Sequence, residues 1–178
     1  MTSLFIPRSV NTSSVQFEKI FESFMLLELH KPSKSIWLVT NWINDIAVLD
    51  NRVGRLKTNR QHLENQYIHL SDLFFQLLGS STCNLIIRDT PHNEEFLHTM
   101  NKKLEHSKER KQRLRIKRCE TIKEGMFLGE RFCITGSMEW TFDGTKEFIG
   151  EAIISTAKNE IANAYSHLQT MYPCSELS

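Results

Sequence analysis

The 178-residue chain has little glycine and proline and no long apolar run. Seven glycines and four prolines, beside 40% hydrophobic and 24% charged residues, exclude a collagen-like, low-complexity or disordered protein. No apolar stretch approaches the roughly 20 residues of a membrane helix, and the opening MTSLFIPRS lacks the basic and apolar regions of a secretion signal. We therefore expect one globular domain over 1–178, located in the cytoplasm and without a membrane partner.

Motifs for metals and nucleotides are also missing. Four scattered cysteines lack the CxxC spacing of a zinc site, and we expect buried thiols: Cys83, Cys119, Cys133 and Cys174. The seven histidines are dispersed, and none forms the HExxH pair of a zinc hydrolase. Neither GxxxxGK[ST] nor GxGxxG occurs. The sequence therefore predicts no metal site and no cofactor.

The net charge of +1 conceals a strongly basic stretch, residues 102–118, which we call the basic segment. It holds nine Lys and Arg against two Glu, so its charge is +7, while the remaining 13 basic and 19 acidic residues give −6. This asymmetry predicts a basic zone on a mildly acidic body. We expect nucleic acid as the partner of five of its cations: Lys111, Arg113, Arg115, Lys117 and Arg118.

The end of the basic segment alternates basic and apolar residues. A period of two predicts a strand with Arg113, Arg115 and Lys117 on one face, while Leu114 and Ile116 point inward. Three cations on one strand face suit a phosphate backbone. The alternative is an edge strand whose charges prevent aggregation, since Lys and Arg are favoured there as well.

Apolar periodicity predicts an α/β domain with a mixed β-sheet flanked by helices on both faces. We expect helices over 12–31, 70–78 and 90–104, with Thr90 as the cap of the third, and a closing helix that turns Ile161, Tyr165, Leu168 and Met171 to one side. Strands are expected at 35–40, 84–88, 113–117 and 148–154, with a hairpin at 126–135. The run 35–40 is continuously apolar, as expected for a covered parallel strand. Residues 41–67 are expected to form a long loop excursion, a feature that is often functional.

The stretch 123–141 is the most informative. A hairpin whose second strand ends in Gly136-Ser137, followed by Trp140, resembles the signature region of the phospholipase D-like superfamily, where His-x-Lys, a turn and Gly-Ser-x-Asn follow one another. Segments 35–45, 49–51, 91–93 and 142–144 are similar to single-domain members found in bacterial genome-defence clusters, including deazapurine-in-DNA modification systems. The resemblance covers nearly the whole chain and implies a phospholipase D-like fold.

The family's chemistry implies specific site residues. One His attacks phosphorus to form a phosphohistidine, a second protonates the leaving oxygen, and Lys and Asn hold the nonbridging oxygens. One motif per chain implies a homodimer. Counting back from Gly136, the His position falls on Lys123 and the Lys position on Gly125, while the Asn position is Glu139.

The chain departs from this pattern where the chemistry depends on it. No histidine lies between His106 and His167, and Glu139 would repel a phosphate unless it is protonated or paired with a cation such as Lys123. The resemblance therefore implies a vestigial motif hairpin, 123–141, without hydrolysis. Plainer alternatives are an exposed Lys123–Glu139 ion pair, a strand-end role for Gly136 and a turn role for Ser137.

Two tryptophans follow predicted strands. Trp42 and Trp140 lie where open α/β sheets bind ligands, and they can stack on bases, with packing as the alternative. The leading hypothesis is a catalytically degenerate, nucleic-acid-binding or assembly subunit, with DNA favoured over RNA, in a bacterial genome-defence or DNA-processing system. One alternative is an active phosphodiesterase that uses Asp45, Asp50 or His92. Another is a purely structural partner of a helicase or translocase, such as an ATPase from the same gene cluster.

Overall fold

A seven-stranded mixed sheet forms the centre of the computed structural model, which describes residues 3–6, 13–51, 67–136 and 152–173. In spatial order its strands are β1 (Ser3–Ile6), β9 (Ala152–Ser155), β8 (Cys133–Gly136), β7 (Gly125–Leu128), β2 (Ser35–Thr40), β5 (Thr82–Arg88) and β6 (Leu114–Cys119). Strands β2, β5 and β6 are parallel, and the other neighbours are antiparallel. The predicted mixed sheet is confirmed, with β1 as an added edge strand.

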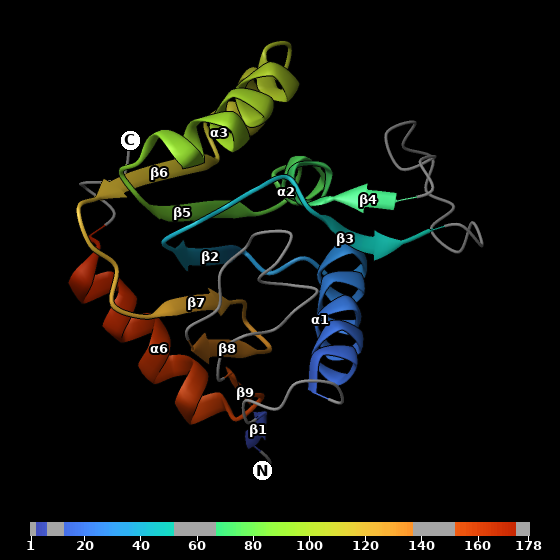
Figure 1. Cartoon of the computed structure of the whole chain (residues 1–178), viewed down its shortest axis with the longest axis vertical. Coiled ribbons are helices and arrows are strands. Elements are labelled where there is room, and N and C mark those ends of the chain that lie inside the picture. The colour runs from blue at the N-terminus through green and yellow to red at the C-terminus, as the bar shows by residue number, and fades with distance from the viewer. Residues whose placement is uncertain (1–2, 7–12, 52–66, 137–151, 174–178) are drawn as a thin grey trace.

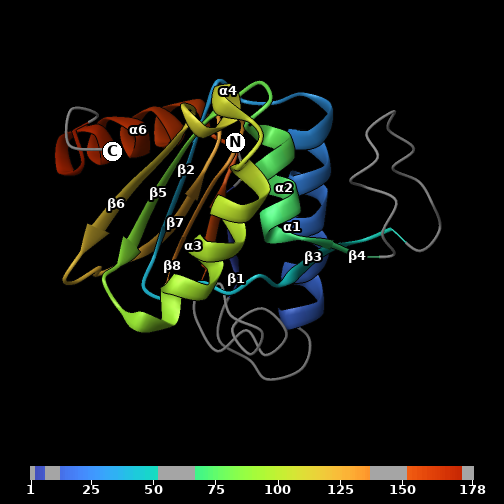
Figure 2. The same ribbon diagram turned by 90° about the horizontal axis from the view of Figure 1, so that it is seen from above.

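Helices cover both faces of this sheet, as predicted. Helices α1 (Ser13–His30), α2 (Leu70–Leu77) and α3 (Pro91–Leu104) lie on one face, and α6 (Lys158–Met171) lies on the other (Figures 1 and 2). None of the helices in the described ranges combines the length and apolar character needed to cross a bilayer.

Strand β2 shows why its sequence is apolar without alternation. Ile36 and Leu38 belong to the core beneath α1, α2 and α3, whereas Trp37 and Val39 belong to the core beneath α6. All four side chains are at most 2% exposed. A strand that is buried on both faces needs apolar residues at every position, so the continuous run follows from its central place.

The segment 41–67 carries more regular structure than a loop. Strands β3 (Ala47–Asp50) and β4 (Tyr67–His69) pair antiparallel in a separate two-stranded sheet. Asp45 ties this sheet to α2, because its carboxylate accepts hydrogen bonds from the backbone N–H and the hydroxyl of Ser71, both at 2.8 Å. Residues 52–66 lie outside the described ranges.

One local prediction is wrong in detail, and the predicted cap position of α3 is confirmed. Ile161 and Leu168 of α6 are buried, but Met171 is 55% exposed, because the last turn of the helix extends past the core it covers. Thr90 occupies the cap position of α3, yet its hydroxyl forms no hydrogen bond with the described residues. The start of α3 is held instead by the side chain of Asn93.

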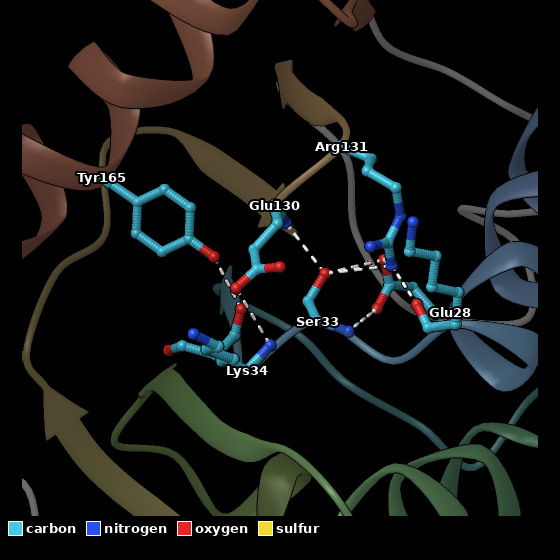
Figure 3. Close-up of polar contacts among 8 residues, drawn as sticks. Glu28, Ser33, Lys34, Glu130, Arg131 and Tyr165 are labelled. Atoms are coloured by element: carbon cyan, nitrogen blue, oxygen red, sulfur yellow. Dashed lines mark hydrogen bonds and ion pairs between the residues drawn. The ribbon is translucent and has the colours of Figure 1, made fainter.

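A buried polar network closes the end of the sheet where the parallel strands begin, which we call the amino edge (Figure 3). Glu28, fully buried at the end of α1, accepts hydrogen bonds from the Ser33 backbone at 2.8 Å and from its hydroxyl at 2.9 Å. Arg131, in the turn between β7 and β8, forms an ion pair with Glu28 at 2.7 Å. Tyr165 of α6 donates to the Ser35 carbonyl at 2.6 Å. This network fixes the amino edge in one arrangement.

Candidate functional site at the carboxyl edge of the sheet

The opposite end of the sheet, where the parallel strands finish, gathers most of the polar loops, and we call it the carboxyl edge. Strands β2, β5 and β6 end there at Thr40, Arg88 and Cys119. Gly125 and Gly136 pair with each other at the same edge, since Val39 of β2 is in register with Met126 of β7. Open α/β sheets bind their ligands at this edge, which makes it the candidate site.

Asn93 organises the loops of the carboxyl edge. Its side chain is buried, with 1% of the residue exposed, and its amide oxygen accepts the Ile43 backbone N–H at 3.0 Å. Its amide nitrogen donates to the Asn41 carbonyl at 2.9 Å and to the Arg88 carbonyl at 2.8 Å. One side chain therefore joins the start of α3, the end of β5 and the loop after β2.

The loop after β2 is held by further hydrogen bonds. The Thr40 hydroxyl donates to the Trp42 carbonyl at 2.9 Å, and the Asn41 side chain donates to the Ile122 carbonyl at 3.0 Å. These hydrogen bonds fix the backbone of residues 40–43, which carries Trp42.

Trp42 lies between a cation and an imidazole. The Arg88 guanidinium is 5.6 Å from the centre of its ring, and the His92 ring meets it edge-to-face at 5.2 Å and 87°. His92 is exposed and shares a 2.8 Å hydrogen bond with the Asn44 side chain. Trp42 itself is half-buried, and both neighbours contact its ring.

A second aromatic–cation pair lies one strand away. The Lys117 ammonium of β6 is 5.5 Å from the ring of Tyr172, which directly follows α6. Burial raises the pKa of Tyr172, and the nearby Cys119 thiol raises it further. Cys119 is in register with Arg88, so the two pairs occupy neighbouring strands. Tyr172 was not among the predicted site residues, because nothing in the local sequence links it to the end of β6.

The structure spreads the basic segment along the whole length of the sheet. Lys111 is exposed on the short helix α4 (Lys108–Lys111), which lies at the amino edge, while β5 and β6 point to the other end (Figure 2). The Arg113 guanidinium donates to the Gly79 carbonyl at 2.7 Å, also at the amino edge. The cations of the basic segment therefore lie at both edges of the sheet rather than in one cluster.

The strand part of the basic segment is β6, an edge strand of the sheet. Leu114 and Ile116 pack against the core, as predicted. Arg115 is half-buried and bonds none of the described residues, while Lys117 lies over Tyr172. The predicted edge-strand role and the phosphate role are both compatible with this placement.

Arg118 points away from Lys117 and is neutralised. Its guanidinium forms ion pairs with Glu94 of α3 and, at 3.3 Å, with Asp89. The hydrogen bond to Glu94 raises the pKa of Arg118 above its ordinary value. Arg118 therefore already has two acidic partners within the protein.

The motif hairpin is described only in part. Lys123 is exposed just before β7, Gly125 is buried at its first position, and Gly136 has a φ of 150°, which side-chain-bearing residues rarely adopt. This backbone conformation gives a physical reason for a glycine at the end of β8. Ser137, Glu139 and Trp140, with segment 142–144, lie outside the described residues.

The three residues considered for an alternative active site are not joined. Asp45 bonds Ser71, Asp50 lies on β3, and His92 bonds Asn44 rather than either carboxylate. Within the described ranges no group of three or more His, Cys, Asp or Glu could hold a metal ion.

Known proteins resemble this chain in structure but not in sequence. No protein-family model and no curated protein sequence matches the chain. Among solved structures, Nuc from Salmonella typhimurium, a phospholipase D family member, superposes with a TM-score of 0.56 at 7% identity, over 99% of this chain and 96% of Nuc. The chain has a phospholipase D-like fold.

Two further structures share this phospholipase D-like fold with the chain. NucT from Helicobacter pylori gives a TM-score of 0.59 at 8% identity, over 99% of this chain and 97% of NucT. TrmBL2, described as an archaeal chromatin protein with a novel mode of DNA binding, gives 0.51 at 9% identity. The chain is covered completely in that match but spans only 54% of TrmBL2. At these identities the likeness concerns the fold.

Proposed function

We propose that this protein binds nucleic acid, with DNA favoured over RNA, through a phospholipase D-like fold whose catalytic motif is degenerate. The carrying observation is Gly125, which stands at the family's Lys position and is buried at the start of β7. A glycine there offers no ammonium group to a phosphate oxygen. Lys123, at the His position, is exposed but is a poor nucleophile while protonated.

Binding without hydrolysis fits the remaining features. TrmBL2, of which 54% superposes on this chain, is described as an archaeal chromatin protein with a novel mode of DNA binding. The basic segment supplies exposed cations for phosphates at the amino edge, among them Lys108 and Lys111 of α4. In this proposal the protein serves a bacterial genome-defence or DNA-processing system, as the family resemblance implies.

Charge reversal tests whether α4 binds phosphates. Lys108→Glu with Lys111→Glu should weaken DNA binding and lower the slope of log affinity against log salt by roughly 1 for each phosphate that is no longer neutralised. Lys19→Glu with Lys158→Glu is the matched control, because both lysines are exposed on other helices. If both double variants bind DNA as the parent does, at every salt concentration, α4 does not bind phosphates and this part of the proposal is wrong.

One observation favours a second candidate, an active phosphodiesterase. His92 is exposed at the carboxyl edge, where a substrate of this fold would lie. Hydrolysis of bis-p-nitrophenyl phosphate and labelled DNA, with and without divalent metals, separates the two. We expect no turnover; turnover that is lost in His92→Ala or Glu139→Ala but kept in His98→Ala would establish the alternative.

The proposed assembly is a homodimer, because one motif per chain leaves the family's site incomplete. Light scattering should give twice the chain mass of 20.8 kDa. A helicase or other ATPase of the same gene cluster is the proposed larger partner. If the protein is only a structural subunit of that partner, it should show no nucleic-acid affinity alone and a stable complex with the ATPase.

A further inference from the structure

Four residues place two rings beside two cations at the carboxyl edge, and we call them the aromatic–cation surface: Trp42, Arg88, Lys117 and Tyr172. The cations lie 5.6 Å and 5.5 Å from their ring centres. Arg88 and Lys117 alternate onto the same side of the sheet, since Lys117 is in register with Ile86, two residues before Arg88. The two cations therefore project from the same face of the sheet, on the neighbouring strands β5 and β6.

Charges around the aromatic–cation surface nearly cancel. Arg118 is occupied by Glu94 and Asp89, and the exposed Lys123 is flanked in sequence by the exposed Glu120 and Glu124. A polyanion therefore gains little here from the overall charge, in contrast to α4, where Lys108 and Lys111 are exposed. Any nucleic acid held at this edge must gain most of its affinity from contact with the rings.

Aromatic side chains bind a base by stacking on its face. In a duplex these faces are covered by neighbouring base pairs, whereas in a single strand they are free. Two rings, each beside a cation from one of two neighbouring strands, match unpaired bases with their phosphates. Tyr172 packs against the core beneath α6, which explains its position, but packing does not require a cation beside each of the two rings.

Building on the proposed function, we infer that the aromatic–cation surface binds single-stranded nucleic acid, with one unpaired base on Trp42 and a second on Tyr172. Asn93 positions the first ring, since its three hydrogen bonds fix the loop that carries Trp42. Arg88 and Lys117 orient the rings and contact the sugar-phosphate chain between the bases. The stacking site and the exposed lysines of α4, Lys108 and Lys111, are then two separate contacts at opposite ends of the sheet.

Anisotropy titrations with a labelled oligo(dT) and with a duplex of equal length test this. Trp42→Leu and Tyr172→Leu should each weaken oligo(dT) binding roughly 5- to 150-fold, as expected when one base can no longer stack. The slope of affinity against salt should stay unchanged, because no phosphate-binding charge is removed. Trp42→Phe and Tyr172→Phe should restore most of the affinity, which a general folding defect would not allow.

Tyr67→Leu provides the matched control, because Tyr67 is a 41% exposed tyrosine on β4, away from this edge. It should bind oligo(dT) like the parent. Stacking should also quench tryptophan emission in the parent and much less in Trp42→Phe.

Two results would overturn the inference: oligo(dT) affinity unchanged in both leucine variants, or a duplex bound more tightly than oligo(dT) and weakened equally by them. In either case a loss of binding on reversal of Lys108 and Lys111 would leave the proposed function standing. Absence of all nucleic-acid binding by the parent protein would instead remove the proposed function and, with it, this inference.

Discussion

The amide oxygen of Asn93 accepts a hydrogen bond from the backbone N–H of Ile43 at 3.0 Å, although 50 residues separate the two in the sequence. With its bonds to the Asn41 and Arg88 carbonyls, this buried amide uses both of its polar atoms to hold the carboxyl edge together. The orientation of Trp42 thus depends on a residue that does not touch its ring.

Replacing Asn93 with Asp should destabilise the protein. The carboxylate would face two backbone carbonyls that now lack a donor, so we expect the free energy of unfolding to fall by about 2–3 kcal/mol in urea denaturation. Asn101→Asp, on the exposed side of the same helix, is the control and should change the free energy of unfolding little. Equal stability of the two variants would show that Asn93 is not the link between α3 and the loop.

The buried ion pair between Glu28 and Arg131 predicts that the loss of one partner destabilises the protein more than the loss of the other. Arg131→Met leaves a fully buried carboxylate without its cation and should cost about 3 kcal/mol of unfolding free energy. Glu28→Gln should cost less, since the Arg131 side chain is 24% exposed and keeps its bond to the Lys31 carbonyl. Urea denaturation of the two variants, with Glu22→Gln as control, measures the two losses in unfolding free energy. A larger loss in Glu28→Gln than in Arg131→Met would contradict this account.

The buried thiols predict alkaline sensitivity. Burial raises the pKa of Cys133 from 9.0 to about 12, with Glu124 and Glu160 adding to the rise. The unfolded thiol loses its proton above pH 9 while the folded one keeps it, so stability should fall as the pH rises from about 9 towards 12. Unfolding at pH 8 and pH 10 should show this fall, and Cys133→Ala should show a shallower one.

The same burial makes these thiols unreactive in the native state. Because burial raises the pKa of both thiols, Cys133 and the fully buried Cys83 stay protonated at pH 8, so alkylation should label them only after unfolding. Peptide mass spectrometry of native and unfolded samples measures this directly. Rapid native labelling of Cys133 would mean that β8 opens far more readily than its packing indicates.

Arg118 and Lys111 should behave differently although both belong to the basic segment. Arg118 is paired with Glu94 and Asp89, so Arg118→Ala should change DNA affinity less than about twofold and stability by at most about 1 kcal/mol. Lys111→Ala should weaken DNA binding and lower its salt slope by about 1, because Lys111 is exposed. A larger effect at Arg118 than at Lys111 would contradict this account of the basic segment.

Much of the fold could be predicted from local patterns. Strand β2 follows from the apolar run 35–40, and α3 follows from Pro91 and the spacing of Phe96, Leu97 and Met100. Strand β1 could not be predicted, since its four residues become a strand only through pairing with β9, about 150 residues further along the chain. Strands β3 and β4 are also short and depend on pairing with each other, so local patterns did not predict them.

The site could be predicted less well than the fold. Trp42 was found because it directly follows a buried strand, but Tyr172 was not, since its neighbour Lys117 lies 55 positions earlier. No local pattern indicated that Arg118 would meet Glu94, or that α4 and the carboxyl edge would lie at opposite ends of the sheet. Each of these is a tertiary contact between elements, which local periodicity does not encode.

Binding without cleavage is the central claim, and one assay tests it directly. End-labelled single-stranded DNA is incubated with excess protein, with and without divalent metal, and each sample is run on both a native and a denaturing gel. We expect the strand to be shifted in the native gel and full-length in the denaturing gel. A strand that is not shifted, or one that is cut by the parent protein but not by His92→Ala, would contradict the account.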